Sequence, residues 1–139
     1  MKQQEFYAHG KLLLSAEYLV LHGATALATP CKLGQKLKVT YQKKDISTWK
    51  SYDNSGEQWF STEFTLKEVS AGMITPKNRE EAILFGLLRN AYKLNPDLAT
   101  SPEADFETYL SFHRKWGLGS SSTLVSLIAQ WASVNPFRL

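Results

Sequence analysis

A glycine- and serine-rich segment near the C-terminal end carries the residues best suited to chemistry. It reads Trp-Gly-Leu-Gly-Ser-Ser-Ser-Thr over residues 116–123 and separates a predicted strand from a predicted helix. Glycine lets the backbone approach a ligand closely, and the first turn of a helix presents unpaired N–H groups at the positive end of its dipole. Serine hydroxyls add hydrogen-bond donors for phosphate or a ligand for a magnesium ion. The segment therefore indicates an anion site, most plausibly for nucleotide phosphates.

The same segment also has a purely structural interpretation. Glycines are common where a strand turns into a helix, and a single serine suffices as a helix cap. The run Ser120 to Ser122 favours the binding interpretation, because serine is only a middling helix former. The segment is not a Walker A motif, which has a lysine before the serine. Nor is it a dinucleotide fingerprint, which has a third glycine.

A second group of polar residues flanks an apolar run near the N-terminal end. Lys11 precedes three leucines, Glu17 and Tyr18 follow them, and His22 stands before a glycine. On composition alone, the charged groups are the solvated ends of a strand, and His22 is a turn residue. A catalytic interpretation needs support from the other segment.

Together the two stretches resemble the motifs of the GHMP kinases, the superfamily of galactokinase, homoserine kinase, mevalonate kinase and phosphomevalonate kinase. The first family motif reads Pro-Gly-Lys, apolar residues, Gly-Glu-His or Gly-Gly-Tyr, then an apolar run with His-Gly or Asp-Gly. Residues 10–23 follow this order, and residues 113–121 match the second motif, Pro-x-x-x-Gly-Leu-Gly-Ser-Ser. The resemblance spans nearly the whole chain. Residues 17–21 are most similar to the mevalonate and phosphomevalonate kinase branch.

The resemblance implies a role for each matching residue. Lys11 matches the motif lysine, which lies near the transferred phosphate and the catalytic carboxylate. Glu17, Tyr18 and His22 match positions beside the phosphoryl acceptor. The hydroxyl of Ser121 lies near the β-phosphate or Mg²⁺, so the implied cofactors are ATP and Mg²⁺. The residues that would wrap the ATP phosphates are Gly117, Leu118, Gly119, Ser120, Ser121 and Ser122.

The sequence departs from the family pattern in several places. His9 and His113 stand where prolines are expected, and Ser122 with Thr123 replaces the usual pair of small residues. In the family, the catalytic aspartate, a magnesium-binding glutamate and the third, glycine-rich motif lie downstream of the second motif. We therefore expect residues 1–139 to be the N-terminal, ATP-binding domain of such a kinase, incomplete at the C-terminal end and inactive alone.

Three functions remain open at this stage. The first is an ATP-dependent kinase that phosphorylates a hydroxyl or phosphate of a small metabolite, with a mevalonate-like acceptor favoured only by residues 17–21. The second is an ATP-dependent decarboxylase of the mevalonate pathway, which shares both motifs. The third is a non-catalytic binding module of the same fold.

Composition limits the class of partner. The 139 residues are 43% hydrophobic and 21% charged, with a net charge of +3, which fits one ordinary globular domain. This mild net charge does not by itself indicate nucleic-acid binding. No apolar run approaches a membrane span or a signal peptide, and the single cysteine suits a reducing compartment. We expect a cytoplasmic protein without membrane or nucleic-acid partners, which associates with itself or another chain through apolar surface at the truncated face.

Alternating and helical patterns predict the elements that position these residues. A capping box at Asn78 and Glu81 opens one helix, which Pro96 stops. A second helix covers residues 120–134. The lysines between residues 32 and 50 are expected to solvate the outer face of the sheet, with a functional basic patch as the alternative. Residues 49–52 are a candidate aromatic wall for adenine. The predicted strands cover residues 12–14, 18–21, 36–41, 49–52, 58–64 and 106–112, with a hairpin turn at 53–56.

This order of elements predicts an α+β or α/β fold with the phosphate-binding turn at a strand-to-helix junction. The resemblance implies the α+β form, a sheet of the ribosomal protein S5 domain 2-like type packed against two helices.

Overall fold

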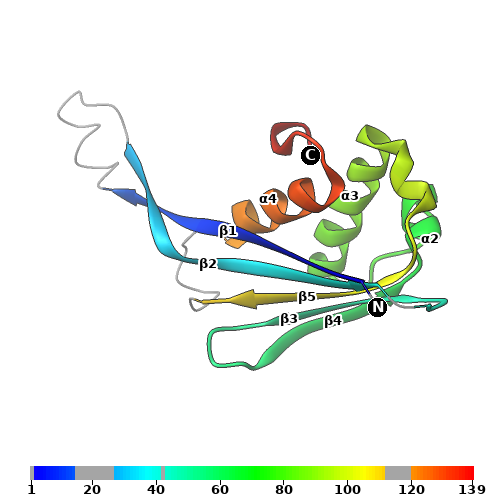
Figure 1. Cartoon of the computed structure of the whole chain (residues 1–139), viewed down its shortest axis with the longest axis horizontal. Helices are drawn as coiled ribbons and strands as arrows, with labels where there is room; N and C mark the ends of the chain where they lie inside the picture. The colour runs from blue at the N-terminus through cyan, green and yellow to red at the C-terminus, as the bar shows by residue number, and fades with distance from the viewer. Residues whose placement is uncertain (1, 15–26, 42, 112–119) are drawn as a thin grey trace.

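A mixed five-stranded sheet, with helices over one of its faces, makes up the part of the chain that the structure describes (Figure 1). The structure is a computed structural model that describes residues 2–14, 27–41, 43–111 and 120–139. The strand order in space is β1-β2-β5-β3-β4, and β5 runs antiparallel to β2 but parallel to β3. The strands are β1 (Lys2–Leu14), β2 (Leu27–Tyr41), β3 (Ser47–Tyr52), β4 (Gln58–Phe64) and β5 (Ala104–Leu110).

The described helices lie together on one face of this sheet (Figure 1). They are α2 (Leu66–Ala71), α3 (Arg79–Leu94) and α4 (Ser120–Ala132), with short 3₁₀ turns at Pro96–Thr100 and Pro136–Arg138. In the described part of the chain, none of them has the length and apolar run that crossing a bilayer requires. Layers of this kind bury one face of the sheet and leave the other to solvent.

An aromatic cluster fills the space between sheet and helices. Phe106 of β5 is fully buried, and its ring stacks on Trp49 of β3 with centroids 5.2 Å apart. Trp131 of α4 meets Phe106 edge-on at 5.2 Å, and Phe64 of β4 stacks on it at 6.2 Å. Residues from three strands and a helix therefore share one core.

The predicted α+β class is confirmed, and so are most of its elements. The hairpin of β3 and β4 turns where expected, and the Asn78 side chain accepts the Glu81 N–H at 2.8 Å at the start of α3. Leu37 and Val39 are buried while Lys36 and Lys38 lie on the outer face, as the alternation predicts. The strand expected at residues 18–21 lies outside the described residues.

Three details of the prediction are wrong. The first strand runs from residue 2 rather than from residue 12, and β2 begins at residue 27 rather than at 36. A third helix, α2, joins the predicted two. Its signal was present in the sequence, since Thr65 and Glu68 have the spacing of a capping box. The Thr65 hydroxyl accepts the Glu68 N–H at 3.2 Å, and it donates to the Glu68 carboxylate at 2.8 Å.

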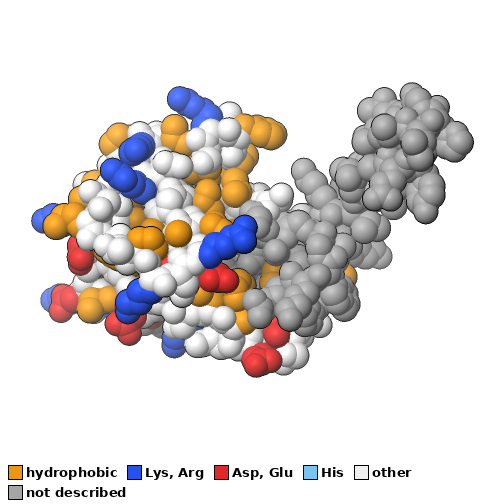
Figure 2. Space-filling model, turned by 180° about the vertical axis from the view of Figure 1, so that it is seen from behind, with side chains coloured by type: hydrophobic (Ala, Val, Ile, Leu, Met, Phe, Trp, Pro, Cys, Tyr) orange, Lys and Arg blue, Asp and Glu red, His pale blue; other side chains and the backbone are white. Residues whose placement is uncertain are grey.

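The outer face of the sheet carries charges of alternating sign. Across the strands, Glu5 is the register partner of Lys38, Lys38 of Glu107, and Glu107 of Lys50. Opposite charges on neighbouring strands attract, so this row is neutral as a whole. Figure 2 likewise shows Lys and Arg side chains scattered over the face that it presents. The lysines thus solvate the outer face, and this row gives no support to the basic-patch alternative.

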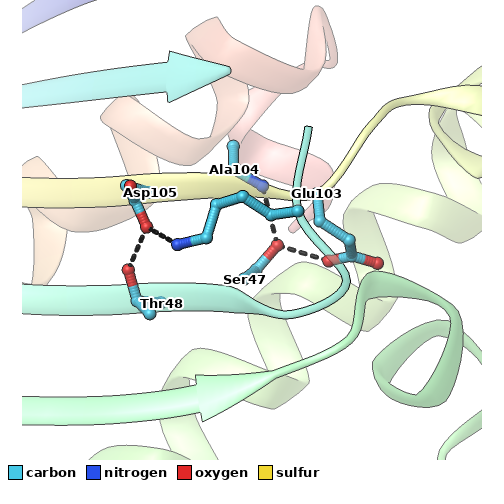
Figure 3. A network of polar contacts seen from close by, with 6 residues as sticks. Ser47, Thr48, Glu103, Ala104 and Asp105 are labelled. Carbon is cyan, nitrogen blue, oxygen red and sulfur yellow. Dashed lines mark hydrogen bonds and ion pairs between the residues drawn. The ribbon is translucent and has the colours of Figure 1, made fainter. Parts of the chain in front are cut away.

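A polar network ties β3, β5 and α2 together at the end of the sheet where β5 begins (Figure 3). The Ser47 hydroxyl accepts the Ala104 N–H at 2.9 Å and donates to the Glu103 carboxylate. That carboxylate also accepts the N–H of Leu66, the first residue of α2, at 3.1 and 3.2 Å. This network lies at the start of β5. The chain reaches the glycine–serine segment from the other end of the sheet, where β5 ends at Leu110. On the same strand pair, hydrogen bonds and an ion pair join Thr48, Asp105 and Lys44.

Candidate functional site

The predicted site residues fall on two described elements and on segments outside them. Lys11 lies in β1, where its backbone pairs with Pro30 of β2 after an irregularity in the register. Ser120, Ser121 and Ser122 form the start of α4. Outside the described residues lie Glu17, Tyr18, His22, Gly117, Leu118 and Gly119.

The first turn of α4 is chemically suited to an anion. It contains no acidic residue, whereas the first turn of α2 contains Glu68 and that of α3 contains Glu80 and Glu81. Acidic side chains in a first turn neutralise the positive end of the helix dipole. In α4 that end is left to other negative groups, and the predicted serine hydroxyls belong to the same turn. The residues present therefore fit a phosphate group.

The strand that leads into the glycine–serine segment is closed by a clamp between Ser111 and Gly34. The N–H of Ser111 donates to the Gly34 carbonyl at 2.9 Å, and the Ser111 hydroxyl donates to the same oxygen at 3.0 Å. The Ser111 hydroxyl also accepts the Gly34 N–H at 2.7 Å. Beyond the last strand pair, Gln35 with Leu110, the Ser111 side chain thus adds hydrogen bonds between the two segments. The chain leaves the sheet at this point.

The start of α4 is attached to the next residue of β2. The Thr123 hydroxyl donates to the Gln35 side-chain carbonyl at 2.8 Å, with both residues buried. Gln35 is the register partner of Ala8, and Lys11 lies three residues further along β1. At about 3.3 Å per strand residue, Lys11 is roughly 10 Å beyond Ala8. The two predicted motifs therefore meet the sheet at the same end.

Close strand contact at Gly34 explains why this position carries no side chain. A Cβ there would lie 2.3 Å from the Ala8 carbonyl oxygen and 2.8 Å from the Tyr7 hydroxyl oxygen. We expect Gly34→Ala to lower the free energy of unfolding by about 1–3 kcal/mol, because backbone must shift to admit the methyl group. Urea unfolding measures this change.

Gly86→Ala is the matched control for that substitution. Gly86 is an exposed residue of α3 whose added Cβ would meet no heavy atom within 4 Å. Alanine is about 1 kcal/mol more favourable than glycine in a helix interior, so this variant should be as stable as the parent or more so. Equal stability of the two alanine variants would contradict the close packing at Gly34.

The candidate aromatic wall for adenine is wrong for Trp49. Its ring is 2% exposed within the core and stacks on Phe106, so no ligand reaches it. Tyr52 faces the opposite side of the sheet and stacks on Tyr109 with centroids 5.1 Å apart. Sequence reasoning treated residues 49–52 as one wall. In a strand, however, side chains alternate between the two faces, so Trp49 and Tyr52, three residues apart, lie on opposite sides of the sheet.

Two tyrosines have a raised pKa, and both stay protonated at neutral pH. Burial is the main cause for Tyr92 of α3, with a smaller contribution from the charge of Glu103. Burial also leads for Tyr109, whose hydroxyl donates to the Glu107 carboxylate at 2.5 Å. Neither is suited to accept a proton as a general base. Within the described residues, His, Cys, Asp and Glu form no group of three or more that could hold a metal ion.

Comparison with known proteins places the fold. No protein-family model and no curated protein sequence matches the chain. Its structure superposes on mevalonate kinase of Methanococcus jannaschii with a TM-score of 0.66 at 14% identity, covering 96% of this chain and 42% of that one. For galactokinase of Lactococcus lactis, solved with galactose, the TM-score is 0.56 at 17% identity, covering 99% and 34%. The fold is that of the GHMP kinases.

A third solved structure has the same fold. The Lin0012 protein of Listeria innocua gives a TM-score of 0.61 at 17% identity and covers 95% of this chain and 36% of that one. The chain therefore spans less than half the length of each of these three solved structures. The resemblance read from the two motifs is confirmed at the level of fold.

Proposed function

We propose that this chain is the ATP-binding part of a GHMP-type kinase, which transfers the γ-phosphate of ATP to a hydroxyl or phosphate of a small metabolite. One observation carries this function: Lys11 of the first motif and the serines of the second meet the same end of a sheet whose fold mevalonate kinase and galactokinase share. A mevalonate-like acceptor is favoured by the sequence of residues 17–21.

Phosphoryl transfer depends mostly on positioning and on neutralising the negative charge that spreads over the transferred group. ATP with Mg²⁺ supplies that group when bound. The N–H groups at the start of α4, together with residues 117–122, hold the phosphates, and the Ser121 hydroxyl reaches the β-phosphate or the metal ion. The ammonium group of Lys11 stabilises charge on the transferred phosphate. Glu17, Tyr18 and His22 lie beside the acceptor.

The proposed kinase needs carboxylates that neither motif supplies. A general base must reach the acceptor hydroxyl, and magnesium prefers oxygen ligands. Glu17 is the only acidic residue within residues 10–23 and 113–123, and its proposed place is beside the acceptor. We therefore assign turnover to the complete kinase and expect residues 1–139 alone to bind nucleotide weakly. A cytoplasmic location, which the single cysteine supports, and self-association are parts of the same hypothesis.

A substrate panel tests the function directly. The complete kinase is purified and incubated with Mg–ATP and mevalonate, phosphomevalonate, homoserine or galactose, and both ADP and the organic product are measured. A phosphorylated metabolite supports the kinase. Carbon dioxide release with phosphomevalonate-type substrates would point to the decarboxylase, and nucleotide binding without any product to a binding module. Failure to bind Mg–ATP would contradict the proposal.

Lys11→Met separates a catalytic lysine from a solvated strand end. Methionine keeps an unbranched apolar stem but removes the charge, so we expect the kcat of the complete kinase to fall by about 10²–10³-fold, as when a group that stabilises transition-state charge is lost. Lys38→Met on the outer face is the matched control and should leave kcat unchanged. A similar kcat for both variants in a steady-state assay would exclude Lys11 from the chemistry.

A further inference from the structure

Two residues, one on either side of the motif glycines and serines, are attached to consecutive residues of β2. Ser111, five residues before the glycine–serine segment, is hydrogen-bonded three times to the backbone of Gly34. Thr123, the last residue of the segment, donates its hydroxyl to the side chain of Gln35. Eleven residues lie between these two anchors in the sequence, yet their partners on β2 are adjacent. The structure thus fixes the distance between Ser111 and Thr123.

The attachment at Gln35 is buried and directional. Gln35 is 4% exposed and Thr123 is 3% exposed, and the oxygen atoms are 2.8 Å apart. A buried amide oxygen without a donor is costly, so this hydrogen bond is strongly required. The Gln35 side chain points to the helix-covered face, since its neighbour Lys36 lies on the outer face.

This contact holds the first turn of α4 against the sheet. Further along the helix, Gln130 donates to the Tyr7 carbonyl at 3.1 Å and the Trp131 indole donates to the Tyr41 hydroxyl at 2.9 Å. Thr123 is the fourth residue of α4, within its first turn. Its bond to β2 therefore contributes directly to the height and rotation of the N–H groups that this turn presents.

We propose that Gln35 is a positioning residue for the phosphate-binding segment, acting through Thr123 while Gly34 holds the opposite end through Ser111. The role in nucleotide binding rests on the function proposed above. Preorganised N–H groups bind a phosphate without first having to be ordered. In an active site, a displacement of about 1 Å can lower the reaction rate on the order of a hundredfold. Gln35 touches no phosphate itself.

A pair of identical substitutions tests the role of the hydrogen bond. Thr123→Val and Thr108→Val each remove one buried, hydrogen-bonded hydroxyl. Thr108 is the control: it is fully buried and donates to the Ser51 hydroxyl at 2.8 Å between β5 and β3. We expect Thr123→Val to weaken Mg–ATP binding by about tenfold or more and Thr108→Val by less than about twofold, although both lose stability. Equal losses of affinity would overturn the proposal.

Two further variants separate positioning from general damage. Thr123→Ser keeps the hydroxyl and should restore affinity to within about threefold of the parent. Gln35→Met replaces the side-chain amide, and with it the acceptor, by an apolar group of similar length. Combining it with Thr123→Val should weaken Mg–ATP binding no more than the larger single effect, since the two side chains form one bond. Additive losses in the double variant would contradict the pairing. Calorimetric titration with Mg–ATP gives each dissociation constant.

Amide hydrogen exchange gives a readout that does not need nucleotide. Peptides spanning residues 111–124 should exchange faster in Thr123→Val than in Thr108→Val, because only the first loses the attachment to β2. If the parent protein binds no Mg–ATP, the proposed function fails, and the positioning role is decided by exchange alone. Faster exchange confined to Thr123→Val then supports the attachment, and equal exchange in the two variants overturns it.

Discussion

Phe106→Ala is expected to lower the free energy of unfolding by about 3–5 kcal/mol, the usual cost of removing a buried phenyl ring. Phe106 is fully buried, and its ring meets Trp49, Phe64 and Trp131, which come from β3, β4 and α4. Alanine leaves a cavity that none of these large rings can fill by a small rotamer change. The loss approaches the whole stability of a typical small domain, which is about 5–15 kcal/mol.

Chemical denaturation with tryptophan fluorescence measures this loss, since two of the tryptophans, Trp49 and Trp131, contact the ring. Phe137→Ala is the matched control, because Phe137 is 96% exposed and its removal should change stability by less than about 0.5 kcal/mol. If Phe106→Ala is unfolded without denaturant, Phe106→Leu gives a smaller, measurable loss. A loss below about 1 kcal/mol for both variants would contradict the shared aromatic core.

Local patterns predicted most elements that bury a face. The start of β1 is an exception, since Phe6 and Ala8 pack against the core but stand among polar residues. Residues 36–41 alternate because this part of β2 lies under the helices and between two strands. Residues 27–34 pair with β1 alone among the described strands, so their sequence is free of that constraint and was not recognised. The helix α2 was missed because six residues give too little periodicity, although Thr65 and Glu68 carried a readable cap.

The sequence could not give the order of strands. The parallel pairing of β3 with β5 joins segments more than fifty residues apart in the chain, and local propensity contains no information on such a contact. The buried Ser47 and its bonds to Glu103 and Ala104 follow from that pairing. They therefore became visible only in the folded chain.

The candidate site divides in the same way. The residue types that could hold a phosphate were recognisable, since a run of three serines at a helix start exceeds what a helix cap needs. Gln35 was not, because a glutamine between Gly34 and Lys36 is typical of a solvated strand. Only the packing of α4 against β2 makes its side chain buried and paired. Residue types suited to a ligand are thus easier to recognise in a sequence than buried polar residues that pack behind them.

In the complete kinase, Gly119→Val is expected to weaken Mg–ATP binding by at least about a hundredfold while the fold is retained. Gly119 directly precedes α4 in the sequence, where backbone must approach phosphate in the proposed site. Valine is branched at Cβ, so it blocks that approach and excludes the positive φ angles that glycine adopts freely. A misplacement of about 1 Å at such a site has this size of effect. Calorimetric titration and circular dichroism measure affinity and fold.

The control for Gly119→Val is the same substitution at Gly86, which is exposed in the middle of α3 with open space around its Cβ position. Valine is a better helix former than glycine, so Gly86→Val should keep both its stability and its affinity for Mg–ATP. Loss of affinity at Gly119 alone then requires that the backbone there approaches the phosphates. Unchanged affinity in a folded Gly119→Val protein would instead show that the turn is only a helix cap, and the phosphate site would have to lie elsewhere.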